Sequence, residues 1–154
     1  MKTYKIIVVS GFGSLEIVSD TFSEQIQHQA EEFKAKGNVQ LRKNNHREAI
    51  EWYTKAIDLI PQSAVYHGNR SQAKFNIHEF EGALEDASKA ITCDPAYLKG
   101  YYRKAIATMG LGNYESALAW FQSLQRKLPN DINIEKNMQE CKTMIFQQGN
   151  YNQI

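Results

Sequence analysis

The sequence has few of the residues that interrupt or cross-link a chain, and it has no excess of either charge. Its 154 residues include three prolines and two cysteines, and 18 basic residues face 17 acidic ones. Such a balance gives no electrostatic footprint for nucleic acid. The cysteines, Cys93 and Cys141, form no CxxC pair. We therefore expect no disulfide framework, and a reduced intracellular compartment, the cytoplasm with the nucleus as an alternative.

Long apolar runs and catalytic motifs are also missing. The run Ile6–Val9 is too short for a signal peptide, and we expect no membrane partner. The four histidines offer no HxxxH or Cys/His spacing, so no metal site is predicted. The stretch Gly11–Ser14 lacks the third glycine and the acidic partner of a nucleotide-binding loop. No nucleophile with a base and no catalytic carboxylate pair is evident, so we expect neither an enzyme nor a cofactor.

The scarce prolines are regularly placed. Pro61, Pro95 and Pro129 lie 34 residues apart, which is the length of a tetratricopeptide repeat. Three units follow, 30–63, 64–97 and 98–131, and other positions fall into register with them. Alanine recurs at Ala49, Ala83 and Ala117, and small residues recur at Gly37, Ser71 and Ala105. Small side chains allow two helices to approach closely, and each proline ends a second helix.

On these residues the chain resembles the tetratricopeptide-repeat family. The resemblance implies an all-α fold, a right-handed α-solenoid of three helix hairpins with a C-terminal capping helix. Three positions depart from the family pattern, because Gln40, Lys74 and Thr108 stand where an aromatic side chain is usual. Such departures loosen local packing without changing the fold, since neighbouring side chains can redistribute the volume.

The expected organisation has three parts. Residues 1–25 form a leader of unknown structure, residues 26–147 the repeat domain, and residues 148–154 a frayed polar tail. The apolar run in the leader suggests a short strand or an unstructured segment. Helices are predicted over 30–42, 47–59, 64–76, 80–92, 98–110 and 114–127, followed by a capping helix over 131–147. The capping helix places Ile134, Met138, Cys141 and Ile145 on one face.

The first helix of each predicted repeat carries basic and amide side chains. Lys34 and Asn38 are four residues apart, as are Lys99 and Arg103, and Asn69 lies on the corresponding inward face of the second repeat. Each alone reads as an ordinary solvated residue. Together they resemble the two-carboxylate clamp of chaperone-binding tetratricopeptide domains. The resemblance implies that the groove binds the C-terminal Glu-Glu-Val-Asp peptide of cytosolic chaperones of the heat-shock protein 90 and heat-shock protein 70 classes.

Two further residues, Gln72 and Ile106, are expected to face the groove beside this clamp. A peptide C-terminus that ends in aspartate carries two carboxylates, which a lysine and two amides can hold by charge-assisted hydrogen bonds. Lys99 and Arg103 then suit the upstream glutamates. The two chaperone classes end alike, so the preference between them stays open.

Three functions remain at this stage. The first is a monomeric co-chaperone or adaptor that captures an acidic C-terminal peptide. The second is a regulatory or autoinhibitory fragment of a type 5 serine/threonine phosphatase, because the segments 66–71, 99–105 and 139–141 resemble the repeat domain of those enzymes. The third is a scaffold that uses its convex face or its N-terminal leader. The clamp favours peptide capture in the first two cases alike.

Overall fold

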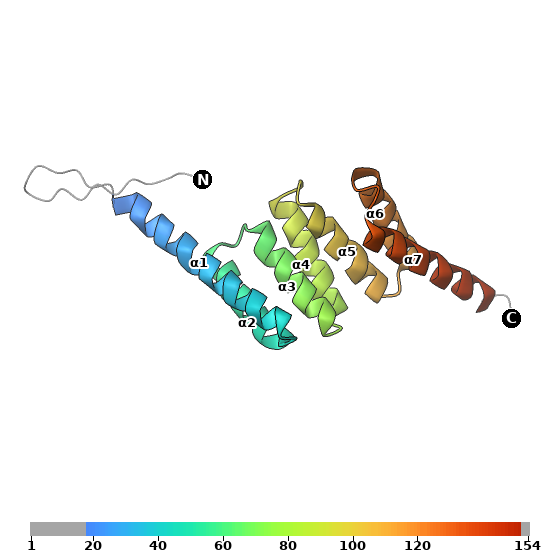
Figure 1. Ribbon diagram of the computed structural model, residues 1–154, viewed down its shortest axis with the longest axis horizontal. Coiled ribbons are helices and arrows are strands. Elements are labelled where there is room, and N and C mark those ends of the chain that lie inside the picture. The colour runs from blue at the N-terminus through green and yellow to red at the C-terminus, as the bar shows by residue number, and fades with distance from the viewer. Residues whose placement is uncertain (1–17, 152–154) are drawn as a thin grey trace, which may run out of the picture.

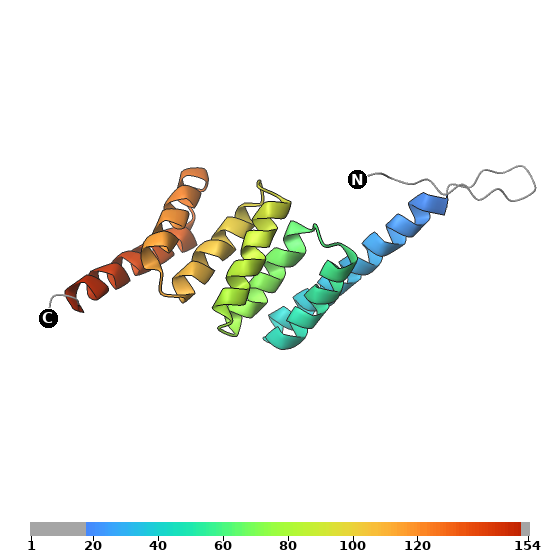
Figure 2. The same cartoon turned by 180° about the vertical axis from the view of Figure 1, so that it is seen from behind.

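The structure, a computed structural model, describes residues 18–151 as a stack of helices with no strand in that range. Seven helices follow one another: α1 (Val18–Arg42), α2 (His46–Leu59), α3 (Ala64–Asn76), α4 (Phe80–Cys93), α5 (Leu98–Gly110), α6 (Tyr114–Lys127) and α7 (Ile132–Tyr151). They lie side by side in chain order, with α1 and α7 at opposite ends (Figure 1), and the view from behind shows the same order (Figure 2). The predicted all-α solenoid of helix hairpins is confirmed.

The turns within the three hairpins share one backbone conformation. Asn44, His78 and Gly112 each have a positive φ, between 61° and 77°, and they lie at equivalent positions in the three repeats. This left-handed conformation reverses the chain after a helix, and glycine and asparagine adopt it readily. The three turns fall in the intervals between the predicted helices of each hairpin, at 43–46, 77–79 and 111–113.

The helix boundaries differ from the prediction mainly at the two ends of the chain. The first helix begins at Val18 and so reaches into the segment 1–25 that was assigned to the leader. No glycine or proline lies between Val18 and Gly37 to stop it. The last helix ends at Tyr151, inside the tail that was expected to fray from residue 148. The apolar part of the leader, Tyr4–Ser10, for which a short strand or an unstructured segment was expected, lies outside the described residues.

The buried apolar residues of the described chain form three clusters. Two lie near the N-terminal end: Ala30, Ala56, Ile57 and Tyr66 form one, and Ala49, Tyr53 and Ala73 form the other. The third joins α5, α6 and α7 around the fully buried Phe121. Ile134, Met138 and Cys141 of α7 belong to this third cluster, as expected of a capping helix. This face of α7 covers the open end of the solenoid core.

A charged centre joins α2, α3 and α4 around the buried Asp86. The carboxylate of Asp86 on α4 accepts two hydrogen bonds from Arg70, at 2.8 and 2.7 Å, and forms an ion pair with Lys74 at 2.8 Å. Arg70 also donates to the hydroxyl of Thr54 on α2, at 3.0 Å. Burial alone would raise the pKa of the Asp86 carboxyl, but the contacts from His67, Arg70 and Lys74 outweigh it and hold that pKa well below its usual range.

Candidate peptide-binding groove

Four of the five predicted clamp residues meet at one cavity. Lys34 and Asn38 of α1, Asn69 of α3 and Lys99 of α5 line a space of about 590 Å³. The remaining wall is formed by Val65 of α3 and by the α4–α5 loop with the start of α5, at Asp94, Ala96, Tyr97 and Leu98. One helix from each hairpin therefore contributes a polar side chain to the same cavity.

Hydrogen bonds fix the orientation of the two amides in this cavity. The hydroxyl of Tyr53, on α2, donates to the Oδ1 oxygen of Asn38 at 2.7 Å, and the Nδ2 group of Asn69 donates to the same oxygen at 3.3 Å. Both bonds are received by the oxygen of Asn38. The two N–H groups of the Asn38 amide therefore have no partner within residues 18–151 and are free to bind an anionic ligand.

Two glycines let tyrosines pack under these amides. A Cβ added at Gly37 would lie 2.6 Å from the Tyr53 ring, and one added at Gly68 would lie 2.8 Å from the Tyr97 ring. Each glycine directly precedes a clamp asparagine, Asn38 or Asn69. The missing side chains thus allow the rings to approach the helix backbone at the floor of the cavity. Burial raises the pKa of Tyr53 to about 12, which keeps its hydroxyl protonated as a donor.

Lys34 is held by a carboxylate on its own helix. Its ammonium pairs with Glu31, one turn before it, and the other oxygen of Glu31 accepts a hydrogen bond from Tyr66 at 2.6 Å. Those bonds, from Lys34 first and Tyr66 second, lower the pKa of the Glu31 carboxyl. The side chain of Lys34 is 25% exposed. Lys34 is therefore positioned before a ligand arrives, and a ligand carboxylate would share it with Glu31.

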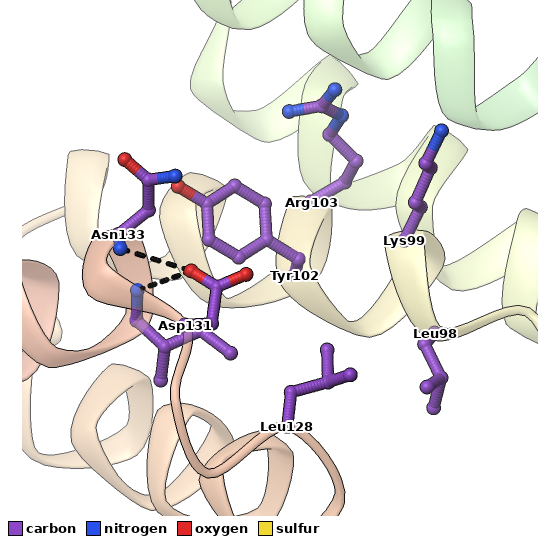
Figure 3. A pocket seen from close by; sticks show the side chains of 8 residues that line it. Leu98, Lys99, Tyr102, Arg103, Leu128, Asp131 and Asn133 are labelled. Atoms are coloured by element: carbon purple, nitrogen blue, oxygen red, sulfur yellow. Dashed lines mark hydrogen bonds between the residues drawn. The ribbon is translucent and has the colours of Figure 1, made fainter.

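Arg103 lies in a second cavity that continues the first. This space of about 300 Å³ shares Leu98 and Lys99 with the first, and its other lining residues are Tyr102, Arg103, Leu128, Asp131, Asn133 and Ile134. Figure 3 shows the charged ends of Lys99 and Arg103 pointing away from Asp131, towards the neighbouring hairpin. The two cavities together form a groove that runs from α1 to the start of α7.

No carboxylate of residues 18–151 forms an ion pair with the guanidinium of Arg103. Burial lowers its pKa, and the nearby groups that oppose this shift are the tyrosines 102, 97 and 53. Its carbon Cζ lies 5.7 Å from the centre of the Tyr102 ring. An arginine keeps its charge in a protein, so within the described chain this cation is partly desolvated without a carboxylate to balance it. A ligand anion would supply the missing partner.

Gln72 and Ile106, the two further residues expected to face the groove, lie outside the lining of both cavities. Gln72 donates a hydrogen bond to Asn76 on its own helix, at 2.8 Å, and lines neither cavity. Ile106 is 6% exposed and belongs to the core cluster with Ala117 and Phe121 of α6. The role of Ile106 as a groove contact stays a prediction.

Several residues of the site were not found from the sequence. Glu31 stands three residues before Lys34, so an ion pair within the helix was the available signal. Asp94 and Tyr97 lie in a loop, and Leu128 and Asp131 flank Pro129, so periodicity could not place them. Between residues 18 and 151 no group of three or more His, Cys, Asp or Glu side chains could hold a metal ion. No helix in that part of the chain is long and apolar enough to span a membrane.

Comparisons with known proteins agree with this fold. The sequence model of the tetratricopeptide-repeat family matches residues 35–63. Serine/threonine-protein phosphatase 5 of Rattus norvegicus is 38% identical over 120 residues, which are 78% of this chain and 24% of the phosphatase. DnaJ homolog subfamily C member 7 of Mus musculus is 36% identical over 119 residues, again 24% of its length. The chain thus spans about a quarter of these relatives.

Solved structures resemble it over most of its length. The first such repeat domain of Spaghetti (RPAP3), bound to the HSP90 peptide SRMEEVD, has a TM-score of 0.73 and 27% identity, and the likeness covers 77% of this chain and 94% of that one. The second repeat domain of the human RPAP3 protein, in complex with the HSP70 peptide SGPTIEEVD, has a TM-score of 0.72 and 27% identity over 76% of this chain and 98% of that one. The chain belongs to the tetratricopeptide-repeat family.

Proposed function

We propose that this chain is a protein-interaction module that captures the free, acidic C-terminus of a heat-shock chaperone. The observation that carries the proposal is the cavity in which Lys34, Asn38, Asn69 and Lys99 present donors. Beside it lies Arg103, which forms no ion pair within residues 18–151. A C-terminal aspartate brings two carboxylates only a few ångströms apart, which matches a site with several fixed donors. The solved relatives that bind HSP90 and HSP70 tail peptides support the same use of the groove.

The roles of the five residues follow from their places in the groove. Lys34 and the amides of Asn38 and Asn69 would bind the two carboxylates of the terminal aspartate by charge-assisted hydrogen bonds. Lys99, on the border between the two cavities, and Arg103 would bind the glutamates that precede it. A bound carboxylate would also complete the coordination of the Arg103 guanidinium, which within the described chain has no acidic partner.

The test is a calorimetric titration with a peptide that ends in Glu-Glu-Val-Asp, with a free and with an amidated C-terminus. We expect the free peptide to bind with a Kd on the order of micromolar, about −8 kcal/mol, because a short flexible ligand loses entropy when it is ordered. Amidation removes one of the two terminal carboxylates and should weaken binding at least tenfold. Equal binding of both peptides would contradict the carboxylate site.

Matched variants separate the groove from general charge. Arg103→Ala and Lys34→Ala should each weaken binding by about 2–3 kcal/mol, the contribution of a hydrogen bond to a charged group. Arg126→Ala and Lys142→Ala remove the same charges from exposed positions on α6 and α7, outside both cavities. They should leave the affinity unchanged. A similar loss in all four variants would show that only net charge matters.

A second candidate function is favoured by the likeness to serine/threonine-protein phosphatase 5. In that case the chain would be the regulatory, autoinhibitory part of such an enzyme, and the groove would serve the same peptide. We expect the purified chain to release no phosphate from a phosphopeptide with manganese present. Inhibition of a separately added catalytic domain of that phosphatase would favour this second function, and its absence would favour the adaptor.

A further inference from the structure

The second cavity contains one acidic side chain, at its far end from the clamp. Asp131 begins α7, and a single oxygen, Oδ1, accepts hydrogen bonds from the backbone N–H groups of Asn133 and Ile134, at 2.9 and 3.1 Å. Figure 3 shows the second oxygen of Asp131 turned into the cavity. That oxygen has no hydrogen bond or ion pair within residues 18–151. Helix capping therefore uses half of the carboxylate and leaves the other half for a ligand.

The position of Asp131 is fixed by the packing of α7 against its neighbours. The residues that follow it in α7 pack into the core with α5 and α6, where Ile134 is 1% exposed. The amide of Asn137, two turns into α7, donates a hydrogen bond to the hydroxyl of Tyr102, at 3.0 Å. Tyr102 lines the same cavity as Asp131. The distance between the acidic oxygen and the cations of α5 is thus fixed by packing and by a hydrogen bond between the two helices.

The order of charges along the groove matches an extended peptide read from its C-terminus. The amides and Lys34 lie between α1 and α3, Lys99 and Arg103 follow on α5, and Asp131 comes next at α7. Packed helices are about 8–10 Å apart, and an extended chain advances about 3.3 Å per residue. A peptide whose terminal aspartate occupies the first cavity and whose glutamates reach Lys99 and Arg103 would therefore bring the next upstream residues to Asp131.

We propose that Asp131 selects the charge of the peptide residue two positions before the Glu-Glu pair, and that it favours a basic one. The proposal rests on the peptide-binding function proposed above. Of the two tails bound by solved relatives, SRMEEVD carries arginine at this position and SGPTIEEVD carries threonine. The two glutamates of the peptide neutralise the positive charges of Lys99 and Arg103. An arginine upstream of them therefore meets the carboxylate of Asp131 and no excess of positive charge. The groove therefore prefers the tail of the heat-shock protein 90 class.

The test is a double-mutant cycle on the full chain. The peptides SRMEEVD, STMEEVD and SEMEEVD, which differ only at the position in question, are titrated into the native protein and into Asp131→Asn. Asparagine keeps a side-chain oxygen that can cap α7, so the variant removes charge without removing the cap. Asp58→Asn is the matched control, since Asp58 is exposed on α2 and lines neither cavity.

We expect the native protein to bind the arginine peptide about threefold more tightly than the threonine peptide, as fits a partly exposed ion pair, and the glutamate peptide more weakly than either. In Asp131→Asn the three affinities should converge, whereas Asp58→Asn should keep the native order. Equal affinities in the native protein, or an arginine preference that persists in Asp131→Asn, would overturn the proposal while peptide binding itself stands. Failure of all three peptides to bind the native protein would instead contradict the proposed function.

Discussion

Gly37 provides a sharp test of how the groove is built, because two opposing effects act on its replacement by alanine. In the interior of a helix, glycine is less favourable than alanine by about 0.5–1 kcal/mol. At Gly37, however, the added Cβ would lie 2.6 Å from one carbon of the Tyr53 ring and 2.8 Å from another. Tyr53 is fully buried and cannot move aside freely. Overpacking of this kind costs about 1–3 kcal/mol.

The clash outweighs the gain in helix propensity, so we expect Gly37→Ala to lower the free energy of unfolding by about 1–2 kcal/mol. Displacement of Tyr53 should also lengthen its 2.7 Å hydrogen bond to Asn38 and weaken peptide binding several-fold. The free energy is measured by urea unfolding followed by circular dichroism, and the affinity by calorimetry.

Gly149→Ala is the control, since a Cβ there meets nothing within 4 Å. It should leave the stability unchanged or raise it slightly. A Gly37→Ala protein as stable as the native one, with unchanged affinity, would refute the argument that the glycine is needed for the approach of Tyr53.

Two more predictions concern polar contacts of residues that do not line the groove. Replacement of Asp86 by asparagine should lower the stability by about 3–5 kcal/mol, because it leaves Arg70 and Lys74 without their buried carboxylate. The pKa of Asp86 lies below its unfolded value of about 4, so its contribution to the free energy of unfolding is complete above about pH 5 and is lost as the pH falls further. Urea unfolding at several pH values should show this decline. A native protein whose stability is the same at pH 3 and pH 6 would contradict it. Tyr53→Phe removes the hydroxyl that holds Asn38 and should lower the free energy of unfolding by about 1 kcal/mol. It should also weaken binding of the free-acid peptide more than binding of the amidated one. An equal effect on both peptides would show that Asn38 does not bind the terminal carboxylate.

The repeat pattern predicted the helices well because their causes are local. Prolines at a spacing of 34 residues and turn residues such as Asn44 and Gly112 act within a few positions of the chain. The four side chains that meet in the first cavity were also predictable, since the residues on one face of each first helix follow from the repeat register. The register alone brings residues 65 positions apart, Lys34 and Lys99, into one site.

The rest of the site depends on contacts between distant segments. Nothing local places Tyr97 against Gly68, or turns one oxygen of Asp131 into a cavity with Arg103. Ile106, expected on the groove face three residues after Arg103, is buried and lines neither cavity. Whether a residue at the edge of a helix face is covered depends on the packing of the next helix, here α6.

The charged centre at Asp86 has a consequence for cooperativity. Asp86 on α4 is linked to α3 through Arg70 and Lys74, and Arg70 also donates to Thr54 on α2, so this centre joins three consecutive helices of the first two repeats. In repeat proteins each repeat contacts only its neighbours, so the links between repeats decide whether they unfold together. A peptide that contacts α1, α3 and α5 would span all three repeats from the groove side. Its binding would couple the third repeat to the two that Asp86 already joins.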